Sequence, residues 1–109
     1  MSDAVPQQFD NVSIICKANT YFDGKVISYT ILFNDGKKKT IGIIFSGSFS
    51  FNTNAPERME IISGNCRVRQ AGDEQWSSYS AGTYFLVRGN SSFEIAVDEG
   101  MLEYVCSYE

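Results

Sequence analysis

The stretch GSFSFNTNAPERMEIISG, residues 47–64, decides how this chain folds. Two short runs within it, FSF and MEII, carry the aromatic and aliphatic side chains that suit a pleated, half-buried strand. Between these runs, Asn54-Ala55-Pro56 favours a turn. The segment therefore predicts two β-strands joined by a turn, with a glycine at each end.

Turn signals recur along the rest of the chain every ~8–12 residues, which is the spacing of an all-β sandwich or barrel. The runs between them are rich in β-branched and aromatic residues, and no segment has a long apolar period typical of a helix. We therefore expect an all-β, single-domain barrel with short connecting turns. The further turn signals are Asp23-Gly24, Asp35-Gly36, Gly47, Gly64, Ala71-Gly72-Asp73, Ala81-Gly82, Gly89-Asn90 and Glu99-Gly100.

Two of these turns predict hairpins. Asp35-Gly36 tolerates the positive φ angles of a tight turn and joins the strand-like runs at residues 26–33 and 38–44. Residues 71–74 join the runs before and after them in the same manner. Three lysines, residues 37–39, follow the first turn. A lysine run there is typical of a solvated edge that resists aggregation, and a phosphate site is the alternative interpretation.

Length and composition indicate one domain with one apolar core. The chain has 109 residues, of which 43% are hydrophobic and 14% aromatic. Nine basic residues against thirteen acidic ones give a net charge of -4. This balance argues against a surface for a nucleic-acid polymer, which is normally basic.

The cysteines and the N-terminus indicate a cytoplasmic protein. Cys16, Cys66 and Cys106 are odd in number and far apart, so a disulfide framework or a cysteine zinc site is not expected. The N-terminus lacks the apolar core of a signal peptide, and no apolar run is long enough to span a membrane. We expect residues 1–16 to be an N-terminal tail, loose over residues 1–8, that can include a first edge strand. Residues 17–109 then form the barrel domain.

Strand parity selects one carboxylate for the interior of such a barrel. If residues 57–62 form a strand, Glu57 and Met59 share one face, whereas Arg58 and Glu60 share the other. A carboxylate in an apolar lumen should have a raised pKa or find a partner. The alternative places Glu57 in a solvated loop just after the turn, and the interior position is the one we favour.

Other polar and aromatic residues have simpler explanations. Arg58 with Glu60 suits an exposed pair, and Arg69 suits a solvated outer face. Arg88 stands beside a turn, where it could bind an anion at a barrel mouth. Aromatic residues at such positions more often belong to a core than to a ligand site. The aromatic residues in question are Tyr21, Phe22, Tyr84, Phe93 and Tyr104.

The outer spacing of residues 47–64 resembles the first metal motif of cupins, which are small jelly-roll-like β-barrels. Metal-binding cupins place histidines inside this motif, whereas this chain has Thr53 and Ala55 there and contains no histidine at all. Histidine-dependent triads and the two-histidine, one-carboxylate iron site are therefore excluded. We expect no metal and no other cofactor. A metal site built from carboxylates, water and a cysteine is the weakest alternative.

Three segments together carry a more specific resemblance. They are NTYFDGKV at residues 19–26, PERMEIISG at residues 56–64 and AGTYF at residues 81–85. In combination they resemble the pyrimidine/purine nucleoside phosphorylase family of small single-domain bacterial cupins, over about residues 17–109. One departure is visible, since this chain has Arg88-Gly89 where the family often has Pro-Gly. The resemblance implies a cupin β-barrel that converts diverse nucleosides and phosphate into free base and ribose 1-phosphate.

The chemistry of that reaction suggests the site residues. Phosphorolysis needs a carboxylate near the cationic sugar, a wall for the base and an anion-binding group for phosphate. Glu57 is the candidate catalytic carboxylate. Parity sets Arg58 and Glu57 on opposite faces, so both serve one site only through a bulge or a neighbouring subunit, and we expect a homodimer. The substrate-binding candidates are Tyr21, Phe22, Tyr84 and Phe93 for the wall and Arg58, Arg69 and Arg88 for phosphate.

A second hypothesis from another class remains open. The same barrel could hold a small sugar or nucleotide ligand without turning it over. Saturable binding without product would select that hypothesis over the phosphorylase.

Overall fold

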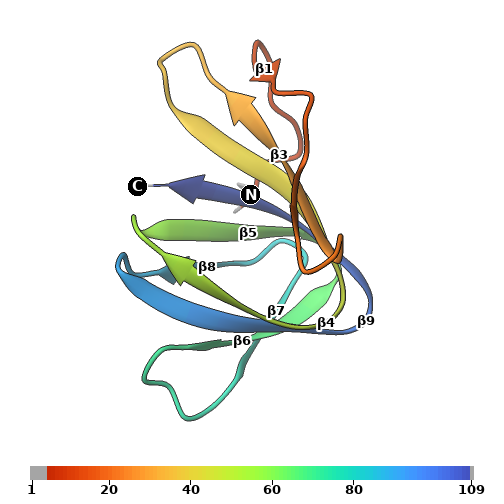
Figure 1. Cartoon of the computed structure of the whole chain (residues 1–109), viewed down its shortest axis with the longest axis vertical. Helices are drawn as coiled ribbons and strands as arrows, with labels where there is room; N and C mark the ends of the chain where they lie inside the picture. Colours follow the sequence, from red (N-terminus) through yellow and green to blue (C-terminus); the bar gives the residue numbers. More distant parts are fainter. Residues whose placement is uncertain (1–4, 109) are drawn as a thin grey trace.

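A computed structural model describes residues 5–108, and within that range every regular element is a β-strand (Figure 1). The described part of the chain accordingly has no helix suited to crossing a membrane. The all-β prediction is confirmed. The strands are β1 (Ser13–Ile14), β2 (Asn19–Tyr21), β3 (Val26–Leu32), β4 (Lys38–Thr53), β5 (Glu57–Ser63), β6 (Asn65–Gln70), β7 (Ser77–Ser80), β8 (Tyr84–Val87) and β9 (Ser91–Tyr108).

The strands form one antiparallel sheet that curls around an apolar interior. Its main path runs β1-β3-β4-β9-β5-β8, with β2 added to β3 and with β6 pairing both β7 and β9. Strands β4 and β9 are much longer than the others and bend together at the right of Figure 1. Strand β9 pairs with β4, β5 and β6, so it holds the two halves of the sheet together.

Two predicted turns are wrong, because Gly47 and Glu99-Gly100 lie inside the long strands. In the β4–β9 ladder, Phe45 pairs with Met101 and Gly47 pairs with Val97. One residue of β4 therefore faces three residues of β9, which is a bulge that bends the strands without ending them. Positive φ angles of 144° at Gly47 and 70° at Gly100 permit this bend. The glycine signals mark a bend in the barrel and not a change of strand.

The two predicted hairpins are confirmed. Strands β3 and β4 pair directly across the Asp35-Gly36 turn, with Gly36 at a φ of 88°. The Asp35 carboxylate accepts a hydrogen bond from the backbone N–H of Lys37 at 2.9 Å, which fixes the turn. Strands β6 and β7 pair across residues 71–76.

The interior is filled by side chains from nearly every strand. The largest fully buried ones include Ile44, Ile61, Ile95 and Leu102. Val5 is also buried, so the predicted loose tail does not extend over it, and residues 1–4 of that tail lie outside the described residues. Within the predicted N-terminal segment, β1 pairs with the edge of β3.

Candidate functional site

A cavity of about 200 Å³ opens between the two halves of the curled sheet. Its floor is apolar and buried, as Ile44 and Met59 show, whereas Tyr21 and Tyr108 are exposed at its mouth. Such a mixture of apolar walls and a few polar groups is typical of a small-molecule site. The residues lining the cavity are Tyr21, Ser28, Thr40, Ile44, Phe51, Asn52, Glu57, Met59, Phe93, Tyr104, Cys106 and Tyr108.

Glu57 contributes the carboxylate of this cavity. It stands at the first position of β5, opposite Tyr108 of β9, and it faces the same side as Met59, as strand parity predicts. The Cys106 thiol donates a hydrogen bond to Glu57 Oε1 at 3.5 Å. Burial raises the pKa of Glu57, and the hydrogen bond from Cys106 opposes that rise.

The groups around Glu57 are neutral hydrogen-bond donors. Burial, followed by the charge of Glu57, raises the pKa of Cys106 to about 12, so this thiol stays protonated at neutral pH. Burial raises the pKa of Tyr108 to about 12, and Thr40 hydrogen-bonds to its hydroxyl. Burial also raises the pKa of Tyr104, which is hydrogen-bonded to Ser28. The cavity therefore combines one carboxylate with neutral thiol and hydroxyl groups, and the Cys106 thiol donates to that carboxylate directly.

An aromatic wall lines the opposite side of the cavity. The rings of Phe51 and Phe93 stack with their centroids 5.6 Å apart, and Tyr21 meets Phe51 edge-on at 6.4 Å. Phe22 packs on Phe51 at 5.5 Å from the next turn. Its backbone φ is 53°, which is unusual for a bulky residue, so the turn holds Phe22 in a strained conformation beside the cavity. Tyr21 and Phe93 thus line the cavity, and Phe22 supports its wall.

Arg58 and Tyr84 do not reach this cavity. The guanidinium of Arg58 lies 3.7 Å from the centroid of the Tyr84 ring on the outer face of β5, and its Nε donates to Glu60 at 3.2 Å. The ladder shifts only between Ile61 and Ser63, so no bulge turns Arg58 inward. Within one copy of the chain, the structure separates Arg58 and Tyr84 from Glu57.

Arg69 and Arg88 lie elsewhere again. Arg69 donates to Glu94 at 2.6 Å and stacks over Trp76 at 4.9 Å. Arg88 donates to the backbone carbonyl of Ala71 at 3.3 Å. Neither arginine lines the cavity that contains Glu57.

Thr53, which stands where a metal-binding cupin has a histidine, has a structural contact. It is buried, its hydroxyl donates to the Arg88 carbonyl at 2.6 Å, and it accepts from the N–H of Ser91 at 3.1 Å. The side chain thus ties the end of β4 to the loop before β9. Across residues 5–108, no group of three or more histidine, cysteine, aspartate or glutamate side chains gathers as metal ligands would.

The donors that accompany Glu57 are not predicted by the sequence. The sequence favours a small buried hydrophobe at Cys106, with a metal ligand as the weakest alternative, and it assigns no role to Ser28, Thr40 or Tyr108. Each of them is a polar side chain on a strand face whose other side chains are mostly apolar. This signal becomes specific only when the register between β4, β5 and β9 is known.

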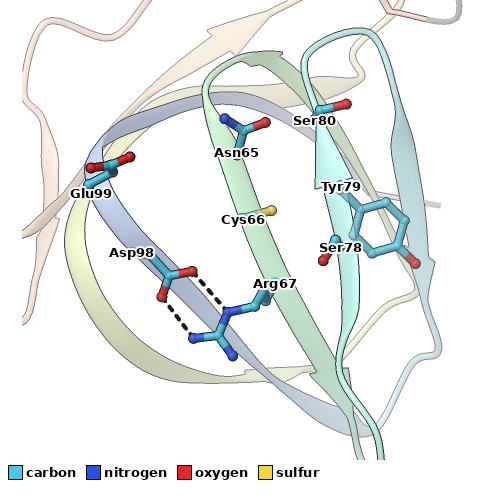
Figure 2. A pocket seen from close by; sticks show the side chains of 8 residues that line it. All are labelled: Asn65, Cys66, Arg67, Ser78, Tyr79, Ser80, Asp98 and Glu99. Carbon is cyan, nitrogen blue, oxygen red and sulfur yellow. Dashed lines mark hydrogen bonds and ion pairs between the residues drawn. The ribbon is translucent and has the colours of Figure 1, made fainter.

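A second hollow, shown in Figure 2, lies between β6, β7 and the bend of β9. Its arginine, Arg67, reaches across to Asp98 and makes two hydrogen bonds, at 2.8 and 3.0 Å. Burial raises the pKa of the adjacent Cys66 to about 11, so its thiol is neutral. The charge of this arginine is already compensated, and the Glu57 cavity is the better candidate site.

Comparison with known proteins adds an independent result. The model of the family described as pyrimidine/purine nucleoside phosphorylase matches residues 16–108. A pyrimidine/purine nucleoside phosphorylase from Cupriavidus taiwanensis is 60% identical over 102 residues, which cover 94% of this chain and 96% of that protein.

Solved structures agree with the fold. A crystal structure of a protein of unknown function from Acinetobacter sp. ADP1 has a TM-score of 0.91 and 50% identity, covering 94% of this chain and 98% of that one. The Clostridium difficile EutQ protein, at 15% identity and a TM-score of 0.64 over 76% of this chain and 67% of that one, shares the cupin fold alone. The chain belongs to the pyrimidine/purine nucleoside phosphorylase family.

Proposed function

We propose that this protein cleaves purine and pyrimidine nucleosides with inorganic phosphate, giving the free base and α-D-ribose 1-phosphate. The observation that carries this proposal is the match to the phosphorylase family over nearly the whole chain, at up to 60% identity among the relatives compared above. The cavity beside Glu57 supplies chemistry that fits the reaction.

The reaction is a displacement at C1′ of the sugar. An oxygen of hydrogen phosphate forms the new bond to C1′ while the C1′–N bond breaks and its electron pair leaves with the base. The phosphate proton ends on the departing base, so atoms and charge balance. Positive charge develops on the sugar ring during this exchange, and a fixed carboxylate stabilises it electrostatically. We assign that role to Glu57, whose position in the cavity needs no rearrangement of the sheet.

The aromatic wall suits the base. Phe51, Phe93 and Tyr21 present ring faces and edges, which bind purines and pyrimidines alike through stacking. Tyr104, Tyr108 and Thr40 present hydroxyl groups near the carboxylate, where ribose hydroxyls can bind. A site that recognises flat rings more than their polar edges accepts a broad range of bases.

Three further features belong to the proposal. Catalysis without a metal is supported by the complete lack of histidine in the chain. A cytoplasmic location is supported by three free cysteines. A homodimer is supported by the exposed apolar groove formed by Ile27, Tyr29, Ile41 and Ile43 on the outer sheet face, which a second copy can cover.

The decisive experiment measures base release from uridine and adenosine by untagged protein, with and without phosphate and with and without EDTA. We expect base release that requires phosphate and survives EDTA. Release without phosphate, or none at all, would contradict the phosphorylase. Saturable nucleoside binding without any product would instead select a non-catalytic cupin. Loss of activity in EDTA that a metal restores would contradict metal independence but would leave the phosphorylase proposal intact.

A further inference from the structure

The cavity that contains Glu57 has no basic side chain among its lining residues. Phosphate binding normally requires a cationic side chain or a cluster of backbone N–H groups. The arginines Arg58, Arg67 and Arg69 are each paired with a carboxylate outside this cavity. Arg88 also lies outside it and donates to the Ala71 carbonyl. A cationic side chain that binds phosphate here therefore reaches the cavity from a residue that does not line it.

The register of the sheet places one lysine in line with Glu57. Lys39 of β4 and Ser107 of β9 are the last pair of the β4–β9 ladder. Continuing that register by one position sets Lys38 opposite Tyr108. Tyr108 in turn pairs with Glu57 of β5. Lys38 and Glu57 therefore occupy one row across three neighbouring strands, with their Cα atoms about 10 Å apart. In Figure 1 the loop joining β3 to β4, the start of β5 and the end of β9 all lie on the left.

Strand parity directs Lys38 to the cavity side of the sheet. On β4, Thr40 and Ile44 line the cavity, and Lys38 has the same parity. Lys39 has the opposite parity, and its ammonium lies over the rings of Phe9 and Phe33 at 5.2 and 5.6 Å. The three lysines after the turn are thus distinct, and one of them faces the mouth of the cavity.

We propose that Lys38 binds the phosphate co-substrate at the mouth of the cavity, an inference that rests on the proposed function. Its side chain is exposed, and across residues 5–108 no ion pair holds its ammonium. A flexible four-carbon stem carrying a compact charge suits a mobile phosphate ligand.

The size of the cavity supports this position. At about 200 Å³ the cavity is smaller than the ~300–1,000 Å³ of most ligand sites, so a nucleoside fills it and leaves phosphate at the opening. With the base against the inner wall of Phe51 and Phe93, the opposite face of C1′ points toward the mouth. Phosphate held there by Lys38 attacks from the side opposite the leaving base.

The test compares Lys38→Gln and Lys38→Arg with the matched control Lys37→Gln, which removes an equal charge from the exposed turn. We expect Lys38→Gln to raise the KM for phosphate about 10- to 100-fold, the scale of one charge-assisted hydrogen bond. The KM for nucleoside and kcat at saturating phosphate should change little. Lys38→Arg should restore most of the phosphate affinity, and Lys37→Gln should match the wild type.

Several outcomes would overturn the inference. Equal phosphate KM values in all four proteins would do so, as would equal increases in both glutamine variants or a fall in kcat alone. If the wild type releases no base, the proposed function fails, and phosphate line broadening in ³¹P NMR then decides about Lys38. Broadening lost only in Lys38→Gln supports the site, whereas equal broadening, or none in the wild type, refutes it.

Discussion

Glu57 and Glu60 lie three residues apart on β5, and their carboxylates have opposite environments. Glu60 is only 5% exposed on the outer face, and Arg58 pairs with it while stacking on Tyr84. Glu57 is half-buried on the cavity face, where a thiol is its hydrogen-bond donor and no cation lines the cavity. The charge of Glu60 is compensated by Arg58 in the native state, whereas no basic side chain lines the cavity beside Glu57. An uncompensated carboxylate in a cavity is a strong indicator of a functional group.

The largest expected effect concerns Glu57. Glu57→Gln keeps the size of the side chain and removes the charge that stabilises the cationic sugar. We expect kcat to fall about 10²–10³-fold, the scale for removing one preorganised electrostatic group. The measurement is steady-state phosphorolysis of uridine by the folded variant. Glu60→Gln is the matched control and should keep kcat within a few-fold, so equal losses in both variants would remove the distinction between the two carboxylates.

A smaller effect, on stability, should be greater for Glu60→Gln than for Glu57→Gln. Glu60→Gln removes the ion pair between Arg58 and a buried carboxylate, and we expect the free energy of unfolding to fall by about 1–3 kcal/mol. Urea unfolding monitored at neutral pH measures this change.

Glu57→Gln should leave stability unchanged or increase it in the same experiment. Because burial raises the pKa of Glu57, the native state binds its proton more tightly than the unfolded state does. The wild type therefore loses stability as pH rises from the unfolded-state pKa of Glu57 through its raised native-state pKa. The glutamine variant has no such pH dependence. A larger stability loss in Glu57→Gln than in Glu60→Gln would show that Glu57 is the structural carboxylate.

The smallest expected effect concerns the thiol beside Glu57. The hydrogen bond from Cys106 lowers the pKa of Glu57, so Cys106→Ala should raise that pKa and move the acidic limb of the kcat/KM profile to higher pH. At neutral pH the change in kcat/KM should stay below about tenfold. Cys106→Ser keeps a donor and should keep the limb near the wild-type position.

Cys66→Ala is the control for the loss of a buried thiol, because Cys66 is equally buried but does not line the cavity that contains Glu57. It should leave the acidic limb in place. Identical shifts in the two alanine variants would assign the effect to altered packing and not to the hydrogen bond.

The sequence was sufficient for the fold class and for the cavity carboxylate, because both depend on local patterns. Turn spacing predicted an all-β domain, and alternation along β5 placed Glu57 inside and Arg58 outside. The same local reasoning failed at Gly47 and Gly100, where a bulge in the β4–β9 ladder turns two apparent breaks into bends.

The residue proposed to bind phosphate could not be identified from the sequence, because its position relative to Glu57 depends on pairing between distant strands. Arg69 is as suitable in type as any lysine, yet Glu94 holds it on another part of the sheet. Lys38 looked like part of a solvated edge until the register joined it to Tyr108 and Glu57. Whether a cation is free or paired is set by residues tens of positions away, which a single sequence does not reveal.

The pairing of β9 with three other strands has a consequence for synthesis on the ribosome. Before residues 91–108 emerge, the strands can form only smaller assemblies: β1 to β4, the β5–β8 pair and the β6–β7 hairpin. Small two-stranded units are marginally stable in water. Strand β9 carries Phe93 of the wall and Cys106 beside the carboxylate, so the nascent chain completes its sheet and its cavity together, once β9 has emerged.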